Sequence, residues 1–192
     1  MADKKKQLPS TFINMTMVLT VVALISALAL GFTYLKTKDA IAAVQLKKTV
    51  EGIKGVLPPF NNNPYEEKYS VDGYDGFEFY PAKDGDKPVG TAVKARTKGF
   101  GEDIIIMVGF DINGKIVNTS VISHKETPGL GSKMSTPKFK DQFMGKKVPD
   151  NGLFVKKDKG DIDAISAATI SSRAFCKAVS LAYEGLKKGG KK

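Results

Sequence analysis

One long apolar run dominates the hydrophobic pattern near the start of the chain. No charged residue occurs between Gln7 and Leu35, and the stretch from Ile13 to Leu35 is mostly Val, Leu, Ile, Ala and Met. A helix of this length crosses a hydrocarbon core of roughly 30 Å. The run therefore predicts a transmembrane helix over residues 13–35, in which scattered Thr hydroxyls can bond back to helix carbonyls.

A cleaved signal peptide is the alternative, with Ala40-Ile41-Ala42 as the small-residue cleavage site. The apolar part of signal peptides usually spans about 7–15 residues, which is shorter than this run, so we expect an uncleaved anchor. Lys4, Lys5 and Lys6 precede the span, whereas Asp39 lies close to the lysines that follow it. By the positive-inside rule, residues 1–12 form a cytoplasmic arm and residues 36–192 an extracytoplasmic domain.

A linking helix is predicted within residues 36–60, over Asp39 to Leu57. It is expected to end at Pro58-Pro59 and the following Asn61-Asn62-Asn63-Pro64. Its apolar side chains recur at helical spacing. They are Leu46, Val50, Ile53 and Leu57.

Four segments then have the alternation or the β-branched and aromatic composition of strands. Asp84-Gly85 and Asn113-Gly114 are turn signals, and the second is typical of a tight hairpin. The predicted strands are Gly76 to Ala82, Pro88 to Lys98, Asp103 to Asp111 and Lys115 to Ser123.

The remaining elements are a loop, two helices and a further short strand. The predictions are a Gly/Pro-rich loop over His124 to Thr136, a helix over Pro137 to Phe143, a strand over Leu153 to Lys156 and a helix over Ser171 to Lys188, followed by a basic tail, residues 186–192. An antiparallel sheet with segregated helices makes the domain α+β.

The content of Lys, Arg and Trp argues against one class of function, nucleic-acid binding. The chain carries 30 basic and 20 acidic side chains, a formal net charge of +10, yet only two are Arg and there is no Trp. A nucleic-acid interface interleaves Arg with aromatic residues, so we expect no nucleic-acid binding. Lysine-rich termini suit solvated tails or contact with anionic membrane lipid.

Few side chains are suited to metal or redox chemistry. Cys176 is the only cysteine and His124 the only histidine. This excludes an internal disulfide and disfavours a metal site, so redox work requires an organic cofactor. We interpret Cys176 as a packed side chain and His124 as an imidazole that is either hydrogen-bonded in the core or exposed to solvent. We expect no catalytic residue and no metal ligand in the chain.

The most informative stretch runs from Asp163 to Ser172, where small and hydroxyl residues precede an amphipathic segment. Ser and Thr favour helix caps, so this is a loop-to-helix junction. The first turn of a helix has free N–H groups that suit a phosphate group. From spacing alone, the plainer interpretation is a capped helix start.

The second informative stretch is the loop His124-Lys125-Glu126-Thr127-Pro128-Gly129-Leu130-Gly131. Its two glycines, introduced by a proline, allow the backbone to approach a flat group without interference from Cβ atoms. The alternative is a rigid surface loop without a ligand.

Both stretches resemble known signatures. The run ending at Thr169 resembles the flavinylation motif Asp-x-x-Ser/Thr-Gly-Ala-Thr, and the run starting at Glu126 resembles the Glu-Thr-Pro-Gly-Leu-Gly signature of FMN-binding domains. They occur in family order, about thirty residues apart. Together with the anchor, they make nearly the whole chain resemble the G subunit of the Rnf electron-transport complex, a relative of the C subunit of the sodium-pumping NADH:quinone oxidoreductase.

The resemblance implies that FMN is attached through its phosphate to the Thr169 hydroxyl. A separate, Mg²⁺-dependent flavin transferase would recognise Asp163, Ser166, Ala167 and Ala168 around the acceptor. The N–H groups near Ser171 and Ser172 at the helix start would hold the phosphodiester. The loop would lie against the isoalloxazine, with Leu130 as its apolar contact and Thr127 or backbone amides as its hydrogen-bond partners. The implied cofactor-binding residues are Thr169, Ser166, Ala167, Ala168, Ser171, Ser172, Glu126, Thr127, Pro128, Gly129, Leu130 and Gly131.

The chain departs from the family pattern in two places. Ala167 stands where the flavinylation motif usually has Gly, and Glu102-Asp103 follow the lead-in Gly99-Phe100-Gly101 where apolar or small residues are common. The first departure adds a methyl group in a tight turn. The second changes part of the surroundings expected for the flavin.

The implied function is a flavoprotein subunit that relays electrons in a ferredoxin/NAD-linked, ion-translocating complex. Its partners would be the other subunits, and its place the bacterial inner membrane, with the C-terminal domain on the periplasmic side. One alternative is an anchored binding or assembly subunit without flavin. The other is a stand-alone anchored flavin reductase.

Overall fold

The computed structural model describes residues 11–190 of the 192-residue chain. Most of the predicted N-terminal arm and the end of the basic tail lie outside the described residues. The chain divides into two compact units, Met1–Leu46 and Lys47–Lys192.

The described part of the first unit is formed by the helix α1 (Phe12–Val56), whose last ten residues belong to the second unit. It is the one helix among residues 11–190 long and apolar enough to cross a membrane, and none of its apolar window is buried. The prediction of separate helices is wrong because α1 runs unbroken through Leu35 and Asp39. As expected, Thr hydroxyls donate to helix carbonyls one turn earlier: Thr16 to Phe12, Thr20 to Thr16, Thr33 to Ala29 and Thr37 to Thr33.

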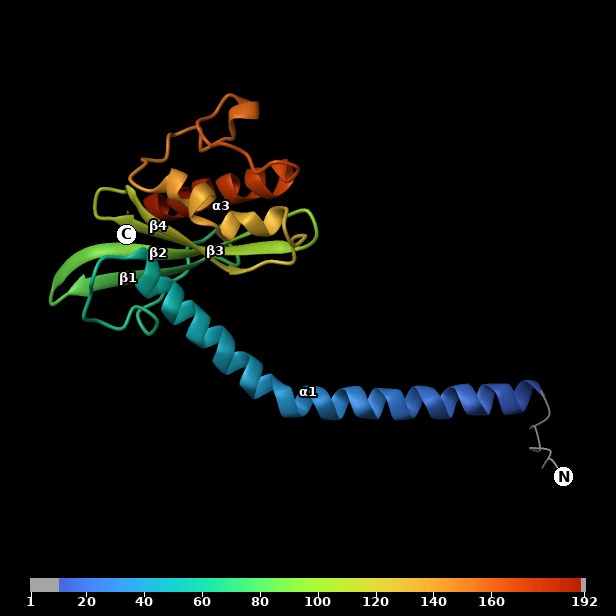
Figure 1. Ribbon diagram of the computed structural model, residues 1–192. Helices are drawn as coiled ribbons and strands as arrows, with labels where there is room; N and C mark the ends of the chain where they lie inside the picture. The colour runs from blue at the N-terminus through green and yellow to red at the C-terminus, as the bar shows by residue number, and fades with distance from the viewer. Residues whose placement is uncertain (1–10, 191–192) are drawn as a thin grey trace. The chain divides into compact units, whose positions relative to one another are not determined.

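The second unit is built on a four-stranded antiparallel sheet in which sequence neighbours pair (Figure 1). The hairpin turn at Asn113-Gly114 is confirmed, whereas the first strand extends to Asp84 and turns at Gly85 and Asp86. The strands are β1 (Glu78–Asp84), β2 (Lys87–Lys98), β3 (Asp103–Asp111) and β4 (Ile116–Ser123).

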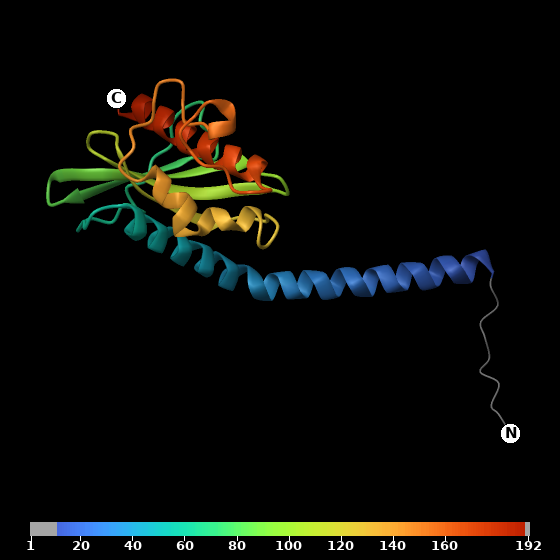
Figure 2. The same cartoon turned by 45° about the horizontal axis from the view of Figure 1, so that its top comes forward.

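Each face of the sheet buries a hydrophobic cluster. Alternate residues of a strand point to opposite faces, so Val93 packs with α3 (Thr169–Gly189) while its neighbour Ala92 packs against Ile53 and Val56 at the end of α1. Figure 2 shows α3 on one side of the sheet. The α+β class is confirmed.

The connections between β4 and α3 differ most from prediction. Leu153–Lys156 is not a strand, because only an isolated bridge joins Val155 to Ile162 before the short 3-10 helix η3 (Lys156–Asp158). The predicted loop contains a turn of 3-10 helix, and the predicted helix from Pro137 divides into two pieces. They are η1 (Gly131–Ser135), α2 (Pro137–Lys140) and η2 (Asp141–Phe143).

A carboxylate on β1 links the sheet to the preceding segment. Glu78 accepts hydrogen bonds from Lys68 Nζ at 2.7 Å, Lys94 Nζ at 2.9 Å and Tyr80 Oη at 2.8 Å. Desolvation raises the pKa of the Glu78 carboxyl, but these three donors outweigh it and lower the pKa from 4.5 to about 2. The folded state therefore favours the ionised carboxylate.

This shift gives a pH dependence of stability. A carboxyl whose pKa is lowered by folding stabilises the protein above its unfolded pKa and loses that contribution as the pH falls through its folded pKa. We expect the wild-type chain to unfold at a higher urea concentration than Glu78→Gln at pH 7, and this difference to shrink between pH 4.5 and about pH 2. Equal midpoints for both chains at pH 7 would contradict the assignment.

Candidate functional site

The helix α3 begins at Thr169, two residues earlier than predicted, and its N-cap is Ala168 without a side-chain cap. The prediction of a hydroxyl-capped start is wrong because the N-cap residue is an alanine, which has no hydroxyl, and Ser172 lies one turn further along the chain. Its Oγ donates to Ala168 O at 2.9 Å and accepts from the Ile165 N–H at 2.9 Å. Ser172 therefore folds the preceding loop back onto the helix start.

Thr169 is half-buried at this start, and Lys157 Nζ lies 3.5 Å from its Oγ1. The Ser172 N–H donates to Ala168 O at 3.1 Å and is not available to a ligand, contrary to the prediction. Within residues 11–190, the N–H groups of Thr169, Ile170 and Ser171 have no acceptor, as the geometry of a first helical turn requires. One hydroxyl, one ammonium group and free N–H groups thus meet at the helix start.

Ala167 is exposed and has a φ of 62°, in the left-handed region. This conformation is the physical reason why the related motif has Gly here, because a Cβ atom in this region costs roughly 1–2 kcal/mol. The turn still forms with alanine at this position and still places Thr169 at the helix start, but the strain lowers the stability of the domain.

Ala167→Gly is therefore expected to stabilise the domain. Glycine removes the Cβ strain but gains freedom in the unfolded chain, which leaves a net gain of about 1 kcal/mol and a rise in melting temperature of about 2–4 °C. Thermal unfolding of the detergent-solubilised chain measures it. Ala164→Gly, in the same run without a positive φ, is the control and brings no gain. A lower melting temperature for Ala167→Gly would contradict the strain argument.

The loop that follows β4 has a buried start and an exposed tip. Glu126 and Gly131 are buried, whereas Thr127, Pro128, Gly129 and Leu130 are exposed. The Gly129 φ of 76° turns the backbone, and the Gly129 N–H donates to Ser132 Oγ at 2.9 Å. The tip is therefore a turn held by a hydrogen bond, and its apolar side chain, Leu130, is exposed.

The two predicted motifs meet in space. Ser171 Oγ donates to Glu126 Oε2 at 2.5 Å, across 45 residues of sequence, and both side chains are buried. Sequence reasoning placed both residues at a flavin site, but it missed this contact. The contact joins the loop to the first turn of α3, next to Thr169.

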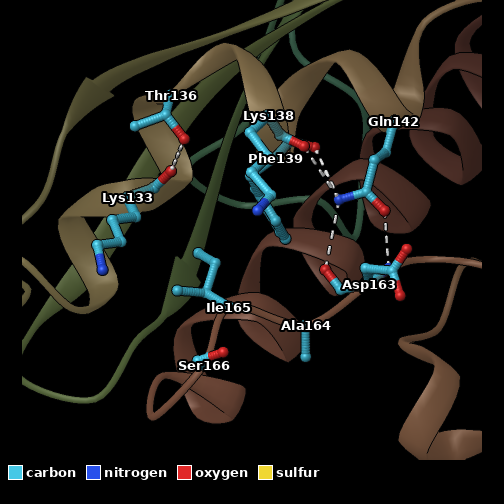
Figure 3. A pocket seen from close by; sticks show the side chains of 9 residues that line it. All are labelled: Lys133, Thr136, Lys138, Phe139, Gln142, Asp163, Ala164, Ile165 and Ser166. Carbon is cyan, nitrogen blue, oxygen red and sulfur yellow. Dashed lines mark hydrogen bonds between the residues drawn. The ribbon is translucent and has the colours of Figure 1, made fainter.

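A pocket of about 470 Å³ borders the motif run (Figure 3). Gln142 closes one side: its Nε2 donates to the Asp163 carbonyl at 3.4 Å and its Oε1 accepts from the Asp163 N–H at 2.7 Å. Sequence reasoning did not single out the residues from η1, α2 and η2, because isolated lysines carry no signal in a lysine-rich chain. The lining residues are Lys133, Thr136, Lys138, Phe139, Gln142, Asp163, Ala164, Ile165 and Ser166.

The Cys176 side chain is buried, and the His124 side chain is hydrogen-bonded to the backbone. Burial raises the pKa of the Cys176 thiol to about 12, so it is a packed thiol rather than a nucleophile. The His124 Nδ1 accepts a hydrogen bond from the Glu126 N–H at 3.2 Å. The described residues contain no group of three His, Cys, Asp or Glu side chains that could hold a metal ion.

The chain is similar to known proteins in sequence and in fold. The FMN-binding domain family matches residues 99–184, which include both motifs. Crystal structures of Shewanella oneidensis NqrC (TM-score 0.50, 22% identity, 63% of this chain and 66% of that one) and of the C subunit of the Na(+)-translocating NADH-quinone reductase from Parabacteroides distasonis (TM-score 0.51, 22% identity, 70% and 78%) share the fold. The fold and the family match define an FMN-binding domain preceded by a long apolar helix.

The sequence relatives are more specific. The chain is 32% identical, over 96% of its length and 95% of the relative, to the G subunit of the proton-translocating ferredoxin:NAD(+) oxidoreductase complex of Clostridium ljungdahlii. It is 38% identical, over 76% and 77%, to the G subunit of the ion-translocating oxidoreductase complex of Salmonella typhi. The chain belongs to the family of G subunits of ion-translocating oxidoreductase complexes, which confirms the resemblance to the Rnf family.

Proposed function

We propose that this chain carries FMN as a phosphodiester on Thr169 and relays electrons between partner subunits of an ion-translocating membrane complex. The single observation that carries the proposal is the placement of Thr169: half-buried, at the start of α3, with Lys157 Nζ 3.5 Å from its Oγ1. The family supplies the cofactor class, and the local geometry suits the attachment.

The residues around Thr169 fit a phosphodiester. Such a group keeps one negative charge, which the Lys157 ammonium and the free N–H groups of Thr169, Ile170 and Ser171 can balance. Ser166 and Ala167 are exposed, so a flavin transferase can reach the run before the acceptor. Bound FMN would supply the electron-carrying chemistry, and the chain would hold it and set its surroundings.

The proposed electron path takes its type from the Clostridium relative, whose name couples ferredoxin to NAD(+). A covalently held cofactor stays at high effective concentration at the contact surface with partner subunits. We propose that α1 anchors the chain in the bacterial inner membrane through residues 13–35. The lysines before the span favour a cytoplasmic N-terminus and a periplasmic FMN domain.

Kinetic competence tests the proposal. In the complex purified from its native host, the flavin on this chain is expected to be reduced after mixing with reduced ferredoxin and reoxidised by NAD⁺, both at least as fast as overall turnover. Stopped-flow absorbance measures the two rates. A flavin that responds more slowly than turnover would contradict the relay. Turnover with no flavin on the chain would instead favour an assembly role, and turnover by this chain without partners a stand-alone reductase.

A further inference from the structure

We propose that Glu126 is a positioning residue that sets the shape of the flavin site without touching the flavin. This inference rests on the proposed function. It concerns a buried carboxylate, 6% exposed, which the resemblance alone places among the cofactor contacts.

The Glu126 carboxylate connects three chain segments. Its Oε1 accepts from the Phe100 N–H at 2.8 Å and the Gly101 N–H at 3.4 Å, in the turn between β2 and β3. Its Oε2 accepts from Ser171 Oγ at 2.5 Å, in the first turn of α3. Because Glu126 itself begins the loop, one side chain holds the turn, the loop and the helix start together.

Two glycines enclose this carboxylate. A Cβ atom on Gly131 would lie 2.6 Å from both Glu126 Oε2 and Ser171 Oγ, and a Cβ atom on Gly99 would overlap Glu126 Oε1. Backbone therefore packs directly against the carboxylate, and both oxygens already have protein donors. A carboxylate beside the ring would also oppose negative charge on a reduced flavin, so this enclosed position suits a structural role.

Each of the three connected segments carries one exposed large apolar side chain. Phe100 is 68% exposed, Leu130 40% and Ile170 50%. The Phe100 N–H donates to the Glu126 carboxylate. Leu130 is followed by Gly131, which packs against that carboxylate, and Ile170 is followed by Ser171, which donates to it. Exposed apolar side chains on three segments that meet at one carboxylate favour a surface that a ligand or partner covers. We assign them as the apolar surface against which the isoalloxazine attached to Thr169 rests.

The test compares flavin surroundings in variants of the full chain made with its flavin transferase. Glu126→Ala removes the connection, so the flavin fluorescence anisotropy is expected to fall toward that of the same protein unfolded in urea, and the midpoint potential to shift. Glu126→Gln is expected to retain wild-type values, because its oxygen accepts from Phe100 and Gly101 and its amide donates to Ser171 Oγ. Glu67→Ala, whose carboxylate is exposed and paired with Lys83 of β1, is the matched control and remains like wild type.

Intact mass measures how much of each variant carries FMN and separates the possible failures. Loss of attachment in Glu126→Ala but not in Glu126→Gln supports the inference, because the acceptor is then misplaced. If Glu126→Ala does not fold, Ser171→Ala and Gly131→Ala disturb the same contact and are expected to shift potential and anisotropy. Wild-type anisotropy and potential in these variants would overturn the inference. A bare wild-type chain would instead overturn the proposed function.

Discussion

Thr169→Ala is expected to abolish covalent flavin on this chain. The substitution removes the only atom to which the proposed phosphodiester is bonded, and it leaves the α3 backbone intact because alanine is a good helix former. Ultraviolet fluorescence of the denatured protein in a gel measures the loss. Ferredoxin-driven NAD⁺ reduction and ion uptake by membrane vesicles are expected to fall to background with it.

Two further variants sharpen this result. Thr169→Ser keeps a hydroxyl and is expected to retain some fluorescence, whereas Thr37→Ala removes an exposed hydroxyl on α1 that donates to Thr33 O at 2.9 Å and is expected to change nothing. Full fluorescence in Thr169→Ala would assign the flavin to another residue. A dark gel band with wild-type ion uptake would favour the alternative of an assembly role.

Phe175→Ala is expected to cost the domain about 3–5 kcal/mol of unfolding free energy, because a fully buried aromatic ring is lost and a cavity remains. Phe175 is 0% exposed, and its ring centroid lies 5.3 Å from that of Phe139 and 4.9 Å from that of Phe143. These contacts attach α2 and η2 to α3. Urea unfolding of the solubilised chain, followed by tyrosine fluorescence, measures the loss.

Phe154→Ala is the matched control for this prediction. Its side chain is 44% exposed, so less burial is lost, no fully buried ring is removed, and the unfolding free energy is expected to fall by only about 1–2 kcal/mol. Similar losses in the two variants would contradict the assignment of the aromatic cluster as the main contact between α3 and α2.

Local pattern accounts for the elements that could be predicted. The strands β2, β3 and β4 follow from alternation and from the Asn113-Gly114 turn, which depend on neighbouring residues. The segment Leu153–Lys156 has apolar residues but no partner strand, and pairing is a long-range property. The unbroken helix α1 was missed because the predicted membrane helix was bounded by its apolar run, whereas Lys36 and Lys38 after that run are good helix formers and continue the helix.

The candidate site was also predicted only in part from the sequence. The two motifs were found from their resemblance to family signatures, and the left-handed Ala167 explains the one departure within the flavinylation motif. The contact of Glu126 with Ser171 joins residues 45 positions apart, so no local pattern contains it. The pocket lined by Lys133 and Gln142 likewise exists only once the helices after the loop pack against the motif run.

The most direct test of the account is fragmentation mass spectrometry of the peptide that contains Thr169, from protein purified out of its native host. We expect a mass increase of FMN less one water molecule, located on Thr169 and absent from the hydroxyls of Ser166, Ser171 and Ser172. An unmodified peptide, or FMN on a different side chain, would contradict it.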